Sequence, residues 1–334
     1  MNRSTLLSAK PRKLFITGGT GFVGRSILRH FHGTPALRQV FPETVVFTRD
    51  PNSFLSKWPE FFGCNWLTFY EGDILDSESF PPKNDFGYII HAAADSVDVP
   101  NPLKRFDQIL NGTRNTLEWA ATNKREVPRF LFVSSGGVYG PMPANMNAFP
   151  ESYNGAPCVK SGRSAYGNAK RAAEQLCSLF YEEGTVVPMI ARCFSFIGRD
   201  LPLNAHFAIG NFIYDAVFQN TIKVKSSGDA IRTYMAQDDL AAWLLTILTV
   251  GEANAIYNVG SDDPLSIKEL AFRIRGLLAP DKKIIFTRED VIPESRFVPD
   301  LTKARSELNL SLEKELDDEI VSIARLLNTR QNRN

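Results

Sequence analysis

The sequence is poor in the residues that build metal sites, disulfide frameworks or membrane anchors. Among 334 residues there are four cysteines and four histidines, and no two cysteines form a C-x-x-C pair. Structural zinc sites and disulfide-rich folds need such clusters, so we expect neither. The longest apolar stretch, Leu240–Val250, is too short to span a bilayer, and the basic start is not followed by the apolar region of a signal peptide. We therefore expect a soluble, cytoplasmic protein that does not bind membranes.

An excess of charge of either sign is also absent. Lysine plus arginine number 38 and aspartate plus glutamate 37, which gives a formal net charge of +1. This balance leaves no electrostatic footprint for nucleic acid, and we expect no such partner. Hydrophobic residues make up 43% and charged residues 22%, values that exclude a disordered or fibrous chain. The length suits one large α/β domain or two closely joined ones.

Short apolar runs alternate with helix-like segments over the first two thirds of the chain. The strands that we predict cover residues 14–17, 44–48, 66–70, 88–91, 130–133, 186–192 and 255–259, and the longer helices cover 25–31, 103–121 and 163–183. Such alternation is typical of an α/β fold, here a Rossmann-like, doubly wound parallel sheet with helices on both faces.

The pattern of the sequence changes beyond Gly198, where expected loops rich in proline, asparagine and glycine separate shorter predicted elements. Doubly wound sheets bind ligands at the carboxyl edge of their strands, so a smaller C-terminal lobe built over that edge would bind the substrate. We predict a Rossmann domain from residues 12–198, to which 233–262 return, and a substrate-binding lobe from residues 199–232 and 263–328.

A glycine-rich turn follows the first predicted strand and opens the first helix. Its glycines are three residues apart, which permits a tight turn, close approach of the backbone to a pyrophosphate and close packing of helix on strand. The N–H groups of the helix N-terminus would then face the phosphates. The residues expected at the cofactor in this turn are Gly18, Gly21, Phe22, Val23 and Gly24.

The same turn also offers a weaker alternative. Residues 19–26 fit the P-loop pattern of nucleoside-triphosphate sites, except that Arg25 stands where that pattern requires lysine. The lysine must reach the β- and γ-phosphates as a point charge, and the planar guanidinium of arginine is not its equivalent. We therefore favour a dinucleotide site.

The end of the second strand indicates which nicotinamide cofactor binds. Thr48 stands where an NAD site would carry the acid that bonds the ribose hydroxyl, and Arg49 follows it. An arginine at this place suits the 2′-phosphate of NADP. We expect NADP. In the alternative, NAD binds, Arg49 is merely solvated and Asp50 bonds the ribose.

Tyr166 and Lys170 are four residues apart, on one face of the helix predicted over 163–183. A protonated lysine stabilises phenolate, so this pair predicts a lowered pKa for the tyrosine. The pair alone is common by chance. It gains weight from the glycine turn and from Ser135, which follows the strand 130–133 and is placed to share the proton of a reacting hydroxyl or carbonyl.

Together these motifs resemble those of an extended short-chain dehydrogenase/reductase, and more narrowly the NAD(P)-dependent nucleotide-sugar epimerase/dehydratase family. The matching segments are the glycine turn, Gly72–Ile74, His91–Ala94, Ser134–Gly140, Tyr166 with Lys170, Gly228–Asp229 with Arg232, Asp238–Asp239, Tyr257–Gly260, and Arg296 before Asp300 and Lys303. They extend over about residues 12 to 325. The combination is specific for the family and much less specific for the reaction.

The resemblance implies a role for each matching residue. Tyr166 would be the catalytic acid/base, Lys170 would tune it and bind the nicotinamide ribose, and Ser135 would be the third catalytic residue. The further cofactor contacts would be Asp73, Ile74, Ala92, Ala93 and Ala94. The contacts to the nucleotide-sugar substrate would be Arg232, Arg296, Ser195 (where relatives commonly have asparagine) and Asn211, which lies in the segment where the family binds the nucleotide. His206, in that same segment, is expected to line the pocket or pack.

The turn after Ser135 departs from the pattern of the eliminating enzymes in the family. Their 4,6-dehydratases carry an Asp-Glu pair here and their decarboxylases need a glutamate, whereas this chain has Gly136 and Gly137. Glycine cannot move a proton, so elimination is disfavoured. What remains is reduction of a 4-keto sugar by NADPH or, as the alternative, C4 epimerisation. Arg49 favours the reductase, because the epimerases usually retain and recycle NAD.

Two further expectations concern the whole chain. A non-catalytic nucleotide sensor on this fold would have lost the tyrosine or the lysine, and Tyr166 and Lys170 are both present. The resemblance also implies that part of the helix over 163–183 meets a second subunit in a four-helix interface, so we expect a homodimer. The base, the sugar and the stereochemistry of the product are not indicated by these residues.

Overall fold

The chain folds around a seven-stranded parallel sheet. The computed structural model describes residues 7–94, 101–203, 207–287 and 295–331. The strands of the central sheet are β1 (Leu14–Thr17), β2 (Thr44–Thr48), β3 (Leu67–Glu71), β4 (Tyr88–His91), β5 (Arg129–Ser135), β6 (Val187–Cys193) and β11 (Ile256–Val259). Their order across the sheet is β11-β6-β5-β4-β1-β2-β3, and all neighbouring pairs are parallel.

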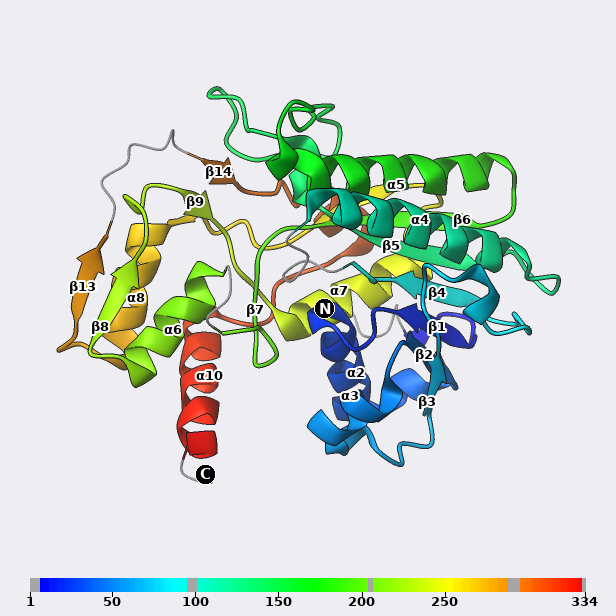
Figure 1. The fold of residues 1–334 in the computed structure, drawn as a ribbon, viewed down its shortest axis with the longest axis horizontal. Helices are drawn as coiled ribbons and strands as arrows, with labels where there is room; N and C mark the ends of the chain where they lie inside the picture. Colours follow the sequence, from blue (N-terminus) through cyan, green and yellow to red (C-terminus); the bar gives the residue numbers. More distant parts are fainter. Residues whose placement is uncertain (1–6, 95–100, 204–206, 288–294, 332–334) are drawn as a thin grey trace.

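Helices cover both faces of this sheet (Figure 1). One face carries α4 (Pro102–Ala121) and α5 (Ala165–Glu182), which lie side by side. The other carries α2 (Phe22–Gly33), α3 (Pro51–Lys57) and α7 (Gln237–Val250). Alternate residues of each strand point to opposite faces. In β1, Leu14 and Ile16 accordingly join the core under α2 and α7, and Phe15 joins the core under α4 and α5.

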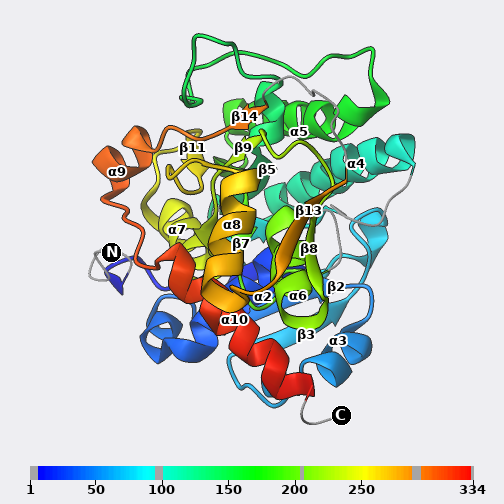
Figure 2. The ribbon, with the colours of Figure 1, turned by 90° about the vertical axis from the view of Figure 1, so that its left-hand side faces the viewer.

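A smaller lobe stands beside the carboxyl edge of the sheet and faces the viewer in Figure 2. It contains α6 (Ala208–Phe218), α8 (Ile267–Leu278) and α10 (Leu316–Gln331) around a third hydrophobic core. Its short strands are β8 (Thr221–Val224) with β13 (Lys283–Phe286), β9 (Ile231–Arg232) between β12 (Leu265–Ser266) and β14 (Arg296–Phe297), and β7 (Phe196–Ile197) with β10 (Met235–Ala236).

The remaining helices are short. They are α9 (Thr302–Leu308), which lies near β11, and the 3₁₀ helices η1 (Pro35–Gln39), η2 (Pro59–Phe61), η3 (Ser77–Ser79), η4 (Gly136–Tyr139) and η5 (Gly162–Ser164). Among the described residues, no helix is both long enough and apolar enough to cross a membrane.

The predicted Rossmann-like parallel sheet is confirmed. The last strand, β11, joins the sheet next to β6, although more than fifty residues of lobe and helix separate them in the chain. The first helix begins at Phe22, three residues earlier than the pattern predicts, because Gly21 is its N-cap and the glycine turn runs directly into the first helical turn. The proposed division of the chain into two domains stays a prediction.

Candidate functional site

The glycine turn between β1 and α2 is closely packed against neighbouring backbone. Gly18 has a φ of +71°, and a Cβ there would lie 2.5 Å from the amide nitrogen of Ala93. A Cβ on Gly24 would lie 2.2 Å from the Cα of Gly19. At Gly21 the nearest atom to a Cβ would be the Gly18 oxygen at 3.4 Å, so this glycine faces more open space. Two of the three spaced glycines are therefore required by packing, and the third leaves room for a ligand.

The N-terminus of α2 is suited to an anion. Gly21 caps the helix without a side-chain hydrogen bond, and the first turn contains no acidic residue. The first hydrogen bond of the helix runs from the Arg25 N–H to the Gly21 oxygen at 2.9 Å. The N–H groups of Phe22, Val23 and Gly24 therefore have no partner within the helix. Such groups, together with the helix dipole, form a phosphate site.

A groove of about 180 Å³ runs past this turn along the carboxyl ends of β1, β2 and β4. Its lining is Gly18, Thr20, Gly21, Phe47, Thr48, Arg49, Gly72, Asp73, Ile74, Ala92, Ala93, Ala94 and Gln108. The structure thus brings together the predicted cofactor residues of four separate segments. Of the other predicted cofactor residues, Phe22, Val23 and Gly24 belong to the helix start, and Tyr166 and Lys170 lie on α5.

Gln108 was missed by the sequence reading. It lies on α4, far along the chain from the strand ends that form the groove, and no motif marks it. Only the packing of α4 on the sheet shows that this side chain lines the groove.

Arg49 and Asp50 at the end of β2 differ in their surroundings. Asp50 is the N-cap of α3, and its carboxylate accepts a hydrogen bond from the Ser53 N–H at 2.8 Å. Arg49 is exposed and lines the groove, and among the described residues it has no hydrogen-bond or ion-pair partner. Capping a helix gives Asp50 a structural task, whereas the guanidinium of Arg49 is available to a ligand.

Ser135, Tyr166 and Lys170 converge at the carboxyl end of β5. Ser135 is the last residue of the strand, and its Oγ accepts a hydrogen bond from the Gly137 N–H at 3.1 Å. Tyr166 lies in the first turn of α5 and interacts with the Ser135 side chain. One turn further on, the Lys170 ammonium donates to the Val133 carbonyl at 2.7 Å. The three predicted catalytic residues therefore do come together.

The predicted electrostatic effect on Tyr166 is not what the structure gives. Burial raises the pKa of Tyr166 to about 12, and the hydrogen bond with Ser135 only partly opposes this. Burial also lowers the pKa of Lys170 to about 8, and its ammonium lies 4.6 Å from the centre of the Phe132 ring. The Lys170 ammonium is thus anchored to the Val133 carbonyl of β5, one helical turn beyond Tyr166. A phenol whose pKa is raised in this way keeps its proton at neutral pH and can donate it.

A buried ion pair next to the predicted catalytic residues was not anticipated. Glu174 lies one turn beyond Lys170 on α5 and binds the Arg192 guanidinium through both oxygens, at 2.7 and 3.1 Å. Glu174 also accepts a hydrogen bond from the Ser134 hydroxyl at 2.5 Å. Lys170 and Glu174 therefore anchor α5 to consecutive residues of β5. The four-residue spacing of Tyr166, Lys170 and Glu174 is a signal that the sequence did contain.

The two glycines after Ser135 have different neighbours. A Cβ on Gly136 would lie 2.8 Å from the ring tips of Phe194 and Phe297, so aromatic rings cover this position. A Cβ on Gly137 would lie 3.3 Å from the Ser135 Oγ and 3.9 Å from the Tyr166 ring, so this position faces the catalytic residues and has room. Neither position supplies a group that can move a proton.

The predicted substrate residues are distributed around the lobe side of this edge. Arg232 on β9 pairs with Phe297 of β14, and its guanidinium lies 5.9 Å from the centre of that ring. The same guanidinium donates to the Ser295 carbonyl at 2.7 Å. Arg296 precedes Phe297 on β14 and so faces the opposite side of the strand pair from it.

Ser195 and Asn211 lie on either side of the loop that enters the lobe. Ser195 is between β6 and β7, and its carbonyl accepts from the Met235 N–H at 3.0 Å. Asn211 lies near the start of α6, where its N–H donates to the Phe207 carbonyl at 3.1 Å. His206 lies outside the described residues.

The P-loop alternative is not supported by the position of Arg25. Its guanidinium turns away from the groove and donates to the carbonyls of Thr20 and Asp200, and it lies 5.0 Å from the centre of the Trp58 ring. A side chain in this place does not reach a phosphate bound at the glycine turn. Among the described residues, no three His, Cys, Asp or Glu side chains are grouped so that they could hold a metal ion.

Comparisons with known proteins agree with this geometry. UDP-glucuronic acid decarboxylase 1 of Danio rerio is 28% identical over 304 residues, which cover 90% of this chain and 69% of that protein. The epimerase Mth375 of Methanothermobacter thermautotrophicus superposes with a TM-score of 0.82 at 22% identity, over 98% of this chain and 96% of the other. RMD of Pseudomonas aeruginosa, solved in complex with NADPH, superposes with a TM-score of 0.74 at 21% identity, over 94% and 98%.

The likeness also extends to a family model. The model of the NAD dependent epimerase/dehydratase family matches residues 14–260, which include the glycine turn, the groove and the residues at the end of β5. This match covers well over half of the chain. The protein therefore belongs to the NAD dependent epimerase/dehydratase family.

Proposed function

We propose that this enzyme is an NADP-dependent reductase that acts at C4 of a nucleotide-activated 4-keto sugar. The observation that carries the proposal is the convergence of Ser135, Tyr166 and Lys170 at the end of β5, where the two residues after Ser135 are glycines. A carbonyl reduction needs one hydride and one proton, and this arrangement offers one proton donor. A bound NADPH supplies the hydride.

Each residue at the end of β5 then has a defined task. Ser135 holds the C4 oxygen, and Tyr166 donates the proton as the alcohol forms. Lys170, with its lowered pKa of about 8, bonds the nicotinamide ribose and eases reprotonation of the phenol. The anchoring of α5 on β5 through Val133 and Ser134 keeps these groups in register with one another.

The turn after Ser135 speaks against decarboxylation and 4,6-dehydration. The decarboxylase relative from Danio rerio is 28% identical. By the resemblance described above, such enzymes carry a glutamate in this turn, and Gly137 has none. At Gly136 the rings of Phe194 and Phe297 occupy the space that a side chain would need. Elimination would therefore lack its second acid or base.

NADP is proposed over NAD because of the end of β2. Arg49 lines the groove as an available cation, and Asp50 is engaged as the N-cap of α3. A guanidinium there would bond a 2′-phosphate in a bidentate manner. The RMD neighbour, solved in complex with NADPH, supports this choice.

The test is an assay with purified protein, NADPH and a small panel of nucleotide-linked 4-keto sugars. The proposal expects loss of the NADPH absorbance and a product heavier by two hydrogens in the mass spectrum. Interconversion of sugar-nucleotide epimers without net consumption of NADPH would instead establish the C4 epimerase. Release of carbon dioxide from a nucleotide-linked uronic acid would refute both.

We also propose that the enzyme is a homodimer that pairs through α4 and α5. These helices lie side by side on one outer face (Figure 1), and each exposes large apolar side chains. Leu103 is 67% exposed, Leu179 44% and Tyr181 38%. Light scattering after size exclusion should give twice the chain mass of 37.3 kDa at micromolar concentration. A monomer would contradict the proposal.

A further inference from the structure

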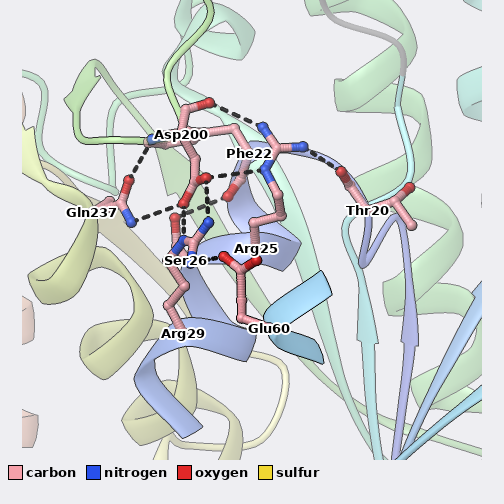
Figure 3. Close-up of polar contacts among 8 residues, drawn as sticks. All are labelled: Thr20, Phe22, Arg25, Ser26, Arg29, Glu60, Asp200 and Gln237. Atoms are coloured by element: carbon pink, nitrogen blue, oxygen red, sulfur yellow. Dashed lines mark hydrogen bonds and ion pairs between the residues drawn. The ribbon is translucent and has the colours of Figure 1, made fainter. Parts of the chain in front are cut away.

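A buried cluster of charged side chains connects the glycine turn with the loop that enters the C-terminal lobe. Figure 3 shows Arg25 and Arg29 of α2 converging on Asp200, with Gln237 of α7 on its other side. We propose that Arg25 is a positioning residue that couples cofactor binding at the glycine turn to the placement of the substrate-binding loop. This inference rests on the proposed function, because it takes the groove to be the cofactor site.

Arg25 bridges two backbone carbonyls that belong to different parts of the molecule. One is the carbonyl of Thr20, which lies within the glycine turn and lines the groove. The other is the carbonyl of Asp200, at 3.0 Å, beyond β7. The guanidinium is a planar group with donors in a fixed geometry, so one fork holds both loops at a set distance. A ligand that moves the Thr20 carbonyl therefore also moves the Arg25 guanidinium, and with it the place where the Asp200 carbonyl can accept its hydrogen bond.

The guanidinium of Arg25 is itself held firmly. The indole of Trp58 packs against Arg25 at 5.0 Å and against Arg29 at 5.1 Å. Arg29 in turn bonds Glu60 at 2.8 Å. A cation held against an aromatic face loses much of its rotational freedom. The bridge therefore transmits a displacement instead of absorbing it in a flexible side chain.

Asp200 is the fixed point on the lobe side. Its carboxylate is fully buried, and it accepts from Arg29 at 3.0 Å and from the Gln237 amide at 3.2 Å. Burial alone would raise the pKa of Asp200, but its bonds with Arg29 hold the pKa below the usual value, so the carboxylate stays charged. Two arginines face Asp200 and Glu60, which balances the buried charge. Removal of one member would leave a buried charge uncompensated.

The loop held by Asp200 lies between two of the predicted substrate contacts. Ser195 lies five residues before Asp200 in the chain, and Asn211 lies beyond the loop, in α6. A Cβ on Gly210 would lie 3.2 Å from the Pro202 carbonyl and 3.6 Å from the Leu201 side chain, so the loop packs directly on the first turn of α6. A movement of Asp200 is thereby passed to the residue next to Asn211.

The competing explanation is that the cluster only stabilises the fold. In that case its loss would lower stability without changing how the lobe responds to the cofactor. Hydrogen exchange with and without NADPH separates the two explanations and needs no turnover of sugar. The segments to follow are the glycine turn at 17–25, the loop Gly198–Leu203, and α6.

The experiment compares wild type with R25Q, R25K and R38Q. Arg38 is the matched control, because its guanidinium also packs on an indole, that of Trp66 at 5.6 Å, away from both loops. In wild type and R38Q, NADPH should slow exchange in all three segments, by about fivefold in the loop and α6. In R25Q the glycine turn should still be protected, while the effect on the loop and α6 is lost. R25K keeps the positive charge but lacks the rigid planar fork, so it should lose most of the effect on the loop and α6.

Equal protection of the loop and α6 by NADPH in wild type and R25Q would overturn the inference. It would also be overturned if R38Q lost this protection to the same extent as R25Q. Should R25Q fail to fold, R25K decides the question, and retention of the full effect there counts against the coupling. In wild type, a protected glycine turn with an unprotected lobe rejects the coupling alone. An unprotected glycine turn in wild type rejects NADP as the cofactor and the coupling with it.

Discussion

The proposed cofactor groove and the proposed substrate side of this molecule are built in different ways. Glycines and alanines make up much of the groove, so its shape is set by backbone, as the close approach of Gly18 to Ala93 illustrates. The substrate side depends on long side chains such as Arg232 and Arg296, which stand on short two-residue strands. Backbone geometry is fixed by the fold, whereas a long side chain can be exchanged without altering it. The first region therefore reveals the cofactor class, and the second can vary with the sugar.

The largest expected effect concerns Tyr166, in the first turn of α5. Tyr166→Phe removes the proton donor and leaves the packing of the ring unchanged. We expect kcat for ketone reduction to fall by about 10²- to 10⁴-fold, the usual contribution of a positioned acid. The dissociation constant for NADPH should change by less than about twofold, because the groove is formed by other residues. Steady-state kinetics and fluorescence titration measure the two quantities.

Ser135→Ala serves as the companion to that variant. It removes the hydroxyl that holds the carbonyl oxygen but keeps the phenol, so its loss of kcat should be smaller than that of Tyr166→Phe. If Tyr166→Phe kept wild-type turnover, the phenol would not be the proton donor, and the proposed mechanism would have to be abandoned.

The next prediction tests whether the shape of the groove is set by the close approach of backbone segments. In Gly18→Ala the new Cβ would meet the Ala92–Ala93 peptide at 2.5–2.7 Å, in a residue whose φ is +71°. The left-handed conformation alone costs about 1–2 kcal/mol for a residue with a Cβ. We expect NADPH binding to weaken at least tenfold and the melting temperature to fall, as measured by titration and calorimetry.

Gly33→Ala is the matched control for that substitution. Gly33 is the last residue of α2, and a Cβ there would have no neighbour within 4 Å. Alanine favours helix over glycine, so this variant should bind NADPH normally and keep or slightly raise the melting temperature. Equal losses in both variants would mean that α2, rather than the close approach at Gly18, is responsible.

The sequence predicted the backbone-built region well because its signals are local. The turn is indicated by a strand, three spaced glycines and a helix start, all within a dozen residues. The parallel sheet is indicated by the alternation of strands and helices along the chain. Arg49 was assigned because it comes directly after the second strand, whereas Asp73, two residues beyond β3, was assigned from the family resemblance; both line the groove. In a parallel sheet all such ends meet at one edge.

The rest depends on contacts between segments far apart in the chain, which no local pattern records. Gln108 lines the groove only because α4 packs where it does. The rings of Phe194 and Phe297, from two distant segments, cover Gly136. The pKa of Tyr166 was predicted with the wrong sign, because the spacing of Tyr166 and Lys170 says nothing about burial or about the carbonyl that engages the ammonium.

A third prediction distinguishes the contribution of Lys170 to activity from its effect on the free energy of unfolding. Lys170 is buried, and its pKa falls from 10.5 to about 8 on folding. Between about pH 8 and 10.5 the unfolded chain binds more protons than the folded one, so this residue makes stability rise with pH across that window. Lys170→Met should remove the rise. Below pH 8 it should stabilise the fold by up to roughly 3 kcal/mol while reductase activity is lost.

Denaturant unfolding of wild type and Lys170→Met at pH 7 and pH 10 provides the measurement. The free energy of unfolding should differ between the two proteins more at pH 7 than at pH 10. Lys223→Met is the control, because that lysine is exposed on β8 and should give no such difference. A Lys170→Met protein that is less stable than wild type at pH 7 would show that the bond to Val133 outweighs the burial of the charge.

The most selective expected effect, confined to one cofactor, concerns Arg49, the one cation among the described residues that line the groove. Arg49→Ser removes the group proposed to bond the 2′-phosphate, which NADH lacks. A charge-assisted hydrogen bond contributes about 1.5–3 kcal/mol, so NADPH should bind at least tenfold more weakly, while the affinity for NADH stays within about twofold. Asp50→Ser keeps a capping hydroxyl for α3 and should leave both affinities unchanged. If Asp50→Ser weakened NADH and Arg49→Ser weakened neither cofactor, Asp50 would be the ribose ligand, the enzyme would use NAD, and an epimerase that recycles its cofactor would replace the reductase as the better explanation of this site.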